Sequence, residues 1–252
     1  MIAVPYHLGR RGAEVGRGPL VILEAVPQPC VIVEGTGGNG GINSQLTEAV
    51  AAHQRPVLIL AGNCNSCLGT LAALEDPGIV WLDAHGDFNT PETTISGALE
   101  GMSLAIATGH CHPELMAKPV REENVVLGAT RSLDPLEQVR LVESRIELAS
   151  IETLPEAVNR LAARVKTIYL HLDLDVLDPA ISPGVNFSEP GGISAEQLLT
   201  VVKRVIATGK LGAATIANFN PDRDRENRTL RIAQQLIAIL GDPRPDGTGC
   251  SP

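Results

Sequence analysis

Two short acidic runs hold the side chains with the most distinctive chemistry in this sequence of 252 residues. Residues 83–87 read DAHGD, and residues 173–175 read DLD. Each run ends a short apolar stretch that is rich in β-branched or aromatic residues, which is typical of a buried strand. Alternate residues of an extended chain point to the same face. We therefore expect Asp83, His85 and Asp87 to converge, and Asp173 to converge with Asp175.

Four carboxylates in one place repel one another unless cations lie among them. Two divalent ions bridged by aspartates would remove that repulsion, and such ion pairs activate water for hydrolysis. The alternative is that the aspartates serve only as turn or cap residues. Four of them at the ends of buried strands make that the weaker interpretation. The two runs therefore predict a binuclear metallohydrolase.

Strand-like stretches alternate with helical patterns along the chain. The predicted strands cover residues 2–5, 30–33, 56–60, 79–82, 124–127, 167–172 and 213–217. The predicted helices cover residues 44–52, 136–143, 155–165, 195–208 and 225–240. This alternation indicates an α/β fold of three layers, α-β-α, with a mainly parallel sheet. We expect a single domain over residues 1–241 and a flexible Pro/Gly-rich tail over residues 242–252.

Polar clusters follow the carboxyl ends of several predicted strands. They lie at residues 62–66, 83–89, 131–134, 173–178 and 218–224. Open parallel sheets bind ligands at that edge, so five segments could build one site there. Two other features are expected to be plain loops: the Gly-rich segment 35–41, which lacks a phosphate-loop ending, and the adjacent His110, Cys111 and His112.

Composition excludes several classes of protein. The net charge of −9 argues against nucleic-acid binding, which needs a basic face. No stretch has the length of a transmembrane helix and no signal peptide is evident, so no membrane partner is expected. Five cysteines without framework spacing fit a reduced cytoplasm. We expect a cytoplasmic protein whose partner is a small molecule.

The motifs resemble those of the ureohydrolase superfamily, which comprises arginase, agmatinase and formiminoglutamase. The resemblance rests mainly on residues 81–91 (WLDAHGDFNTP), 96–102 (SGALEGM) and 171–179 (HLDLDVLDP). Residues 61–69 and 218–221 resemble two further motifs in divergent form. The resemblance covers the chain from about residue 57 to residue 240, and it implies an arginase-like fold.

The resemblance also implies two Mn²⁺ ions per chain. Asp83 and Asp173 would bridge the ions, Asp87 would bind the first ion, and His85 and Asp175 would bind the second. Alignment without a gap places Cys64 where the family has a histidine ligand for the first ion. A thiolate is a softer donor that favours Zn or Fe(II). The alternatives are a shift of one position, which would offer Asn65, and a Cys64 that is merely buried, as is expected for Cys67.

Substrate positions match those of enzymes that act on an α-amino acid. By resemblance, Asn89, Thr94 and Ser96 hold an α-carboxylate, while Asp134 and Glu137 contact the α-amino group. Two other positions depart from the family pattern. Glu100 replaces a histidine associated with proton transfer, and Asn218 replaces a glutamate that pairs with the guanidinium.

The loss of that glutamate removes a bidentate carboxylate–guanidinium pair, so a less basic guanidine is the expected substrate. Within the superfamily, the chain resembles the amidinohydrolases of D-cycloserine biosynthesis, which cleave Nω-hydroxy-L-arginine to L-ornithine and hydroxyurea. The resemblance implies that a hydroxide bridging the metal ions attacks the guanidine carbon while Asp87 holds it and carries a proton. Glu100 is expected to orient the N–OH group or relay protons.

Three other interpretations stay open at this point. The chain could be another ureohydrolase, acting on arginine, agmatine or formiminoglutamate. It could be a metal-binding homologue without activity, or, against the evidence of so many convergent aspartates, an interaction module. The sequence shows no counterpart of the extended carboxyl-terminal tail that helps arginases to form trimers, so we expect a monomer.

Overall fold

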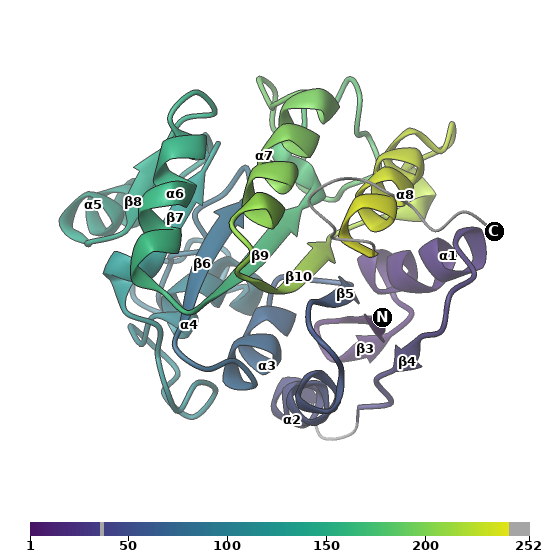
Figure 1. The fold of residues 1–252 in the computed structure, drawn as a ribbon, viewed down its shortest axis with the longest axis horizontal. Coiled ribbons are helices and arrows are strands. Elements are labelled where there is room, and N and C mark those ends of the chain that lie inside the picture. The colour runs from purple at the N-terminus through teal and green to yellow at the C-terminus, as the bar shows by residue number, and fades with distance from the viewer. Residues whose placement is uncertain (36–37, 242–252) are drawn as a thin grey trace.

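The computed structural model describes residues 1–35 and 38–241, and its centre is one eight-stranded sheet in which every neighbouring pair is parallel (Figure 1). In spatial order the strands are β4 (Val31–Ile32), β1 (Ile2–Val4), β5 (Val57–Ala61), β10 (Leu211–Ala217), β9 (Thr167–Asp173), β6 (Pro77–Leu82), β7 (Val125–Gly128) and β8 (Glu147–Ala149). A small hairpin of β2 (Tyr6–His7) and β3 (Arg10–Arg11) stands apart from this sheet. The predicted tail, residues 242–252, lies outside the described residues.

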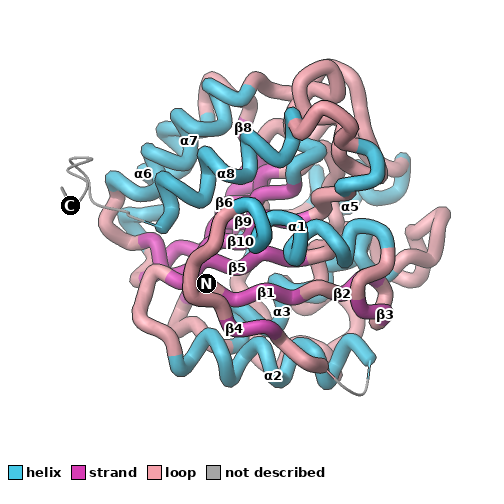
Figure 2. The backbone as a smooth tube through the Cα atoms, turned by 90° about the vertical axis from the view of Figure 1, so that its right-hand side faces the viewer, coloured by secondary structure: helices cyan, strands magenta, loops and turns pink. Residues whose placement is uncertain are grey.

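Helices cover both faces of the sheet, as Figure 2 shows edge-on. One face carries α1 (Gly18–Ala25), α6 (Leu154–Arg164), α7 (Ala195–Ala207) and α8 (Arg228–Gly241). The opposite face carries α2 (Gly38–Ala52), α3 (Ser66–Ala72) and α4 (Ser103–Ala107), and α5 (Pro135–Glu143) adds Leu141 to the same core. Short 3₁₀ turns occupy Glu14–Arg17, Leu99–Met102, Glu122–Asn124, Leu174–Val176 and Pro221–Arg223.

The two cores follow from the period of the strands. In β5, Leu58 and Leu60 belong to the core on the face that carries α1, α6, α7 and α8, while Val57, Ile59 and Ala61 belong to the core on the opposite face. Successive side chains of a strand point to opposite faces, so a strand covered on both faces is apolar throughout. The prediction of a three-layer α/β fold with a parallel sheet is confirmed.

Some expected boundaries were wrong. The Gly-rich segment was expected to be a loop through residue 41, yet α2 begins at Gly38. Ile42, Leu46 and Val50, spaced by four residues, are buried along one side of α2. Their burial offsets a cost of about 1 kcal/mol for each glycine in a helix. Helices α1, α3 and α4 and strand β8 were missed because each is too short to establish a period.

The last helix begins at Arg228 and not at residue 225. The Asp224 carboxylate accepts hydrogen bonds from the backbone N–H groups of Thr229 (3.2 Å) and Leu230 (2.8 Å). An acidic side chain that satisfies the free N–H groups of the first turn sets where a helix starts. Within residues 1–35 and 38–241, no helix combines the length and hydropathy needed to cross a membrane.

The order of the strands decides where a site can form. The chain leaves β5 and enters β6 without pairing the two strands, and it returns later to place β9 and β10 between them. A ligand site in an open α/β sheet lies where the strand order reverses, beyond the carboxyl ends of the strands. Ala61, Ala217 and Asp173 are register partners at that edge, and Leu82 at the end of β6 pairs with Leu172. The loops after the four central strands therefore start side by side.

Candidate metal centre and active site

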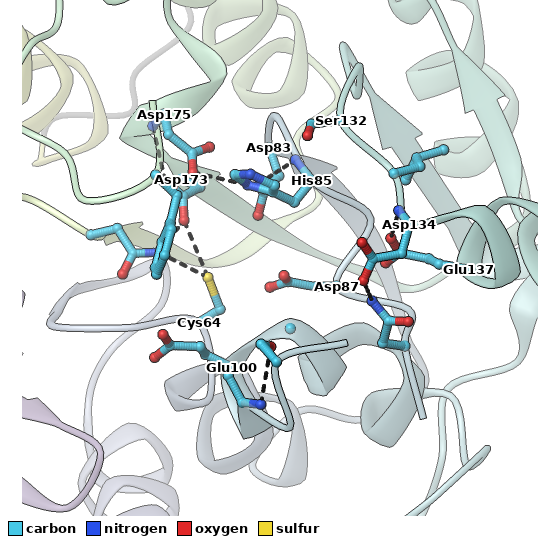
Figure 3. A pocket seen from close by; sticks show the side chains of 17 residues that line it. Cys64, Asp83, His85, Asp87, Glu100, Ser132, Asp134, Glu137, Asp173 and Asp175 are labelled. Atoms are coloured by element: carbon cyan, nitrogen blue, oxygen red, sulfur yellow. Dashed lines mark hydrogen bonds and ion pairs between the residues drawn. The ribbon is translucent and has the colours of Figure 1, made fainter. Parts of the chain in front are cut away.

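A cavity of about 230 Å³ opens at the carboxyl edge of the central strands. Both acidic motifs line it (Figure 3). All the predicted metal ligands are among its lining residues, as are all but one of the predicted substrate residues: Cys64, Asp83, His85, Asp87, Asn89, Ser96, Glu100, Asp134, Glu137, Asp173, Asp175 and Asn218. The structure therefore joins segments that lie as far apart as residues 64 and 218.

Two groups of ligand atoms within this cavity could each hold an ion. Cys64, Asp83, His171 and Asp173 have ligand atoms within 4.8 Å of one another, and so do Asp83, His85 and Asp175. Asp83 belongs to both groups, as expected of a bridging residue. Asp173 belongs only to the first group.

Asp87 belongs to neither group, yet it lines the same cavity. Its Oδ2 atom is buried and has no hydrogen-bond partner within the described part of the chain. A buried carboxylate oxygen without a partner is costly, so its position indicates a missing ligand. Oxygen, nitrogen and sulfur donors converge here, which is a donor set that suits divalent metal ions.

The first motif is held by its own backbone and by α4. Asp83 directly follows β6, and its carboxylate accepts hydrogen bonds from Trp81 Nε1 (3.1 Å) and from the backbone N–H of His85 (2.7 Å). Asp87 has a positive φ of 48°, a conformation that non-glycine residues rarely adopt. Its carbonyl oxygen accepts from the N–H groups of Leu104 (2.9 Å) and Ala105 (3.1 Å) at the start of α4. These bonds hold the strained residue in place.

The second motif is tied to the first. Asp173 Oδ1 accepts from the backbone N–H of Asp175 (2.9 Å), and Asp175 Oδ1 accepts from the N–H of Ala84 (3.1 Å). The Arg131 guanidinium donates to the carbonyl oxygens of Asp175 (2.8 Å), Val176 (3.1 Å) and Glu189 (2.8 Å). One arginine therefore fixes the chain that carries the second motif.

Burial and mutual repulsion dominate the electrostatics of the cluster. Burial raises the pKa of Asp87 and Asp173 well above the usual range, and neighbouring aspartates raise it further. Burial and the Asp83 charge raise the pKa of Asp175 to about 6. For His85, burial acts to lower the pKa, but hydrogen bonds to Asp175 and Asp83 raise it to about 12. A protonated His85 thus supplies the positive charge that a metal ion would bring.

Cys64 faces the cavity, and its sulfur contacts two polar neighbours. Sγ donates to Asp173 Oδ2 (3.2 Å) and accepts from Asn218 Nδ2 (3.2 Å). Burial raises the pKa of this thiol well above its ordinary value, with Asp87 and Asp173 adding to the rise. Asn65, the alternative ligand, instead donates to Leu99 and Ser103 and does not line the cavity. Cys67 lies inside α3 and also stays outside the cavity.

The expected substrate residues divide into three groups in the structure. Asn89, Ser96 and Asp134 line the cavity, and Asn89 Nδ2 donates to Asp134 Oδ2 (3.0 Å). Thr94 is not among the lining residues. Its hydroxyl accepts the N–H of Gly97 (3.0 Å) in the loop that carries Ser96. Glu137 lines the cavity, and both of its oxygens already accept backbone N–H groups.

Glu137 has a structural task that the sequence did not indicate. Its Oε1 accepts from the N–H of Phe88 (2.8 Å), and its Oε2 accepts from the N–H of Asp134 (3.1 Å) in a capping box at the start of α5. A Cβ atom on Gly86 would lie 2.6 Å from Glu137 Oε1. The glycine of the DAHGD motif therefore allows Glu137 to reach the backbone beside Asp87.

The two positions that depart from the family pattern both reach the cavity. Asn218, at a positive φ of 64°, donates through Nδ2 to Asp173 Oδ2 as well as to Cys64. Glu100 Oε2 lies 3.6 Å from Nδ1 of the buried His7, whose Nε2 lies 3.7 Å from Glu14. Burial raises the pKa of Glu100, although His7 acts in the opposite direction.

Several lining residues were missed by the sequence analysis. Ser132 and Leu133 lie within a segment that was predicted to reach the site, but they were not named. Phe187 is 58% exposed and lies in the loop that follows the second acidic motif, but it was not named. His171 does not line the cavity, but it belongs to the first group of ligand atoms. It could have been found, because it precedes Asp173 by two residues and so shares its face of the strand. His110 lies outside helices and strands, as expected, and its Nε2 atom lies 2.7 Å from Glu122 Oε1.

The fold and site together define a metal-dependent hydrolase of the ureohydrolase type. Residues 17–240 match the model of the arginase family. The chain therefore belongs to the arginase family, and the resemblance seen in its motifs is confirmed.

Named relatives and solved structures agree with this family. The chain is 32% identical to the arginase of Bacillus subtilis over 221 residues, which cover 81% of this chain and 74% of that protein. It is 33% identical to the arginase of Brevibacillus brevis over 204 residues, covering 73% and 68%. The structure of Bacillus cereus arginase superposes with a TM-score of 0.84 at 28% identity, covering 99% of this chain and 98% of that one. The formimidoylglutamase of Bacillus subtilis shares the fold, with a TM-score of 0.79 at 17% identity over 94% and 83% of the chains.

Proposed function

We propose that this arginase-family hydrolase cleaves Nω-hydroxy-L-arginine to L-ornithine and hydroxyurea, using two Mn²⁺ ions per chain. This is the reaction of the D-cycloserine amidinohydrolases that the motifs resemble. One observation carries the proposal: an amide, Asn218, stands at the cavity wall beside the candidate metal ligands, and its nitrogen is already committed to Cys64 and Asp173.

The amide at this wall disfavours arginine as the substrate. The guanidinium of arginine keeps its charge at all ordinary pH values and needs a carboxylate partner when it is taken out of water. Asn218 offers no charge to that group. An N-hydroxyguanidine is less basic because its N–OH group withdraws electrons, so it can enter the cavity neutral and without such a partner.

The other end of the cavity suits an α-amino acid. Figure 3 shows Asp173 and Asp175 at one end and Asp134 and Glu137 at the other. Asp134 would accept the α-ammonium group, while Asn89 and Ser96 would donate to the α-carboxylate. Thr94 and Glu137 would not contact the substrate. They would position the residues that do, Thr94 by holding the Ser96 loop and Glu137 by holding the Asp134 backbone. A substrate with both charged groups is therefore preferred to a simple amine.

The reaction needs a water molecule, a proton carrier and a leaving amine. Two divalent ions, when bound by Cys64 and the aspartates of both motifs with His85, would lower the pKa of water and neutralise the cluster. The unpartnered Oδ2 of Asp87 is placed to accept a hydrogen bond from that water and to pass its proton on. The oxygen of water joins the guanidine carbon, the bond from that carbon to the side-chain nitrogen breaks, and this nitrogen leaves as the amine of ornithine. Glu100 would accept the hydrogen of the N–OH group.

The test measures kcat/KM for several substrates with a single preparation of the enzyme loaded with Mn²⁺. We expect kcat/KM for Nω-hydroxy-L-arginine to exceed that for L-arginine by about 100-fold or more, or about 2.7 kcal/mol of transition-state stabilisation. Hydroxyagmatine, which lacks the carboxylate, should be a poor substrate. Asn218→Glu should raise kcat/KM for L-arginine, with Asn218→Gln as the uncharged control.

One observation favours a second candidate, L-arginine itself, since the relatives described above are named arginase. The same assay decides between the two. Equal kcat/KM for arginine and its hydroxylated form in the wild type would refute the hydroxyarginine assignment.

A further inference from the structure

His171 is a buried imidazole that the proposed reaction does not use. It lies in β9 as the register partner of Trp81 in β6 and of Thr215 in β10. Its ring is fully buried and stacks on the Trp81 ring, with centroids 3.7 Å apart and planes inclined by 14°. Neighbouring strands thus fix both the position and the plane of the imidazole.

Hydrogen bonds fix which nitrogen of the ring carries the proton. The Tyr169 hydroxyl donates to Thr215 Oγ1 (2.8 Å), and the same hydroxyl lies 2.9 Å from His171 Nδ1. A phenol has one hydrogen, so with Nδ1 it must act as the acceptor. Nδ1 therefore carries the hydrogen, and Nε2 keeps its lone pair.

The lone pair of Nε2 has no partner in the part of the chain that the structure describes, although the atom is buried. Burying an acceptor without a hydrogen bond is costly, so such an atom calls for a specific explanation. The ring of His171 also belongs to the ligand-atom group with Cys64, Asp83 and Asp173. Since Tyr169 occupies Nδ1, the nitrogen left for that group is Nε2.

We propose that His171 is a nitrogen ligand of the first metal ion, alongside Cys64, Asp83 and Asp173. The proposal rests on the two-ion site of the proposed function. A metal-binding histidine usually donates the N–H of its second ring nitrogen to an oxygen atom, which fixes the tautomer and the orientation of the ring. Here the Tyr169 hydroxyl, itself bonded to Thr215, is that oxygen. Trp81 sets the plane of the ring and also donates to Asp83, so it supports two ligands at once.

This ligand makes the two ion sites chemically different. The first ion would have one sulfur and one nitrogen donor, while the second would have His85 and carboxylate oxygens. Thiolate and imidazole together favour Zn²⁺, Co²⁺ and Fe²⁺ over Mn²⁺. When Zn²⁺ and Mn²⁺ compete, the first site should therefore take Zn²⁺ before the second site does.

The test measures metal binding, without reference to turnover. His171→Phe keeps a ring of similar size against Trp81 and removes the nitrogen. The matched control is His110→Phe, which alters an imidazole outside the cavity. After loading with Co²⁺ and dialysis, wild type and the control should retain two ions per chain, with the charge-transfer absorption of a thiolate bound to cobalt. His171→Phe should retain about one ion, bind the other about 100-fold more weakly or worse, and lose that absorption.

A second measurement uses the unaltered protein, so it does not depend on how the variant folds. In wild type labelled with ¹⁵N-histidine, Zn²⁺ should shift the Nε2 resonance of His171 and leave its Nδ1 protonated. Two ions bound by His171→Phe with wild-type affinity and absorption would overturn the proposal, as would a Zn²⁺ titration that moves only the resonances of His85. A wild type that binds no ion would instead refute the proposed function together with this ligand.

Discussion

Metal binding should release protons from this protein, because several of the proposed metal ligands are protonated before they bind an ion. Ligands must lose their protons before they bind a metal ion. The pKa values of Cys64, Asp87 and Asp173 are raised well above their ordinary values by burial and by neighbouring charges. The pKa of His85 is raised to about 12, since it pairs with Asp175 and Asp83.

The size of the effect follows from Cys64 and His85. At pH 7.5 and without metal, Cys64 and His85 each hold one proton, because burial raises the pKa of the thiol well above its ordinary value and the paired carboxylates raise the pKa of His85 to about 12. Two divalent ions would expel both protons, because a metal ion binds the thiolate of Cys64 and the neutral imidazole of His85. About one proton per ion corresponds to about 1.4 kcal/mol of binding free energy for each pH unit.

The affinity for metal ions should rise with pH, because binding releases protons. We expect the Kd of each Mn²⁺ ion to fall about 10-fold between pH 6.5 and pH 7.5, at one proton per ion. Calorimetry in two buffers with different ionisation enthalpies counts the released protons directly. Cys64→Ser should bind with about one proton fewer, because serine offers no thiol to ionise, and Cys67→Ser is the matched control. A Kd independent of pH over this range, or no buffer dependence of the enthalpy, would refute the reasoning.

Three further predictions concern the residues around the ligands. Gly86→Ala should cost about 1–3 kcal/mol in urea unfolding, because the new methyl would lie 2.6 Å from Glu137 Oε1. Gly40→Ala, where no atom lies within 4 Å of the added methyl, is the control and should not destabilise. Arg131→Ala should lower the unfolding free energy by about 2–4 kcal/mol, since its guanidinium donates to several backbone carbonyls; an unchanged urea midpoint would contradict this. Glu100→Gln should lower kcat for the hydroxylated substrate by about 100-fold with little change in KM, and an unaltered kcat would remove Glu100 from the reaction.

Much of the fold could be predicted because strands and helices leave local periods in the sequence. The two acidic motifs follow strands β6 and β9, and each motif places its carboxylates within five residues, so Asp83 and Asp175 were recognisable without a structure. Boundaries failed where a distant contact decides them. Helix α2 begins inside a glycine-rich segment because its buried side packs on the sheet. The start of α8 is set instead by a nearby residue, Asp224, which caps its first turn.

The sequence by itself predicted the metal-site chemistry, because four aspartates beside a histidine at the ends of buried strands repel one another unless cations or protons lie among them. Tertiary structure decided which other groups join them. Cys64 meets Asp173 across 109 residues, and Asn218 meets Cys64 across 154. The physical reason is the order of the strands: β9 and β10 are inserted between β5 and β6 late in the chain, so neighbours at the site are not neighbours in sequence. The left-handed backbone of Asp87 and the free nitrogen of His171 likewise follow from packing across strands and helices, which no local pattern records.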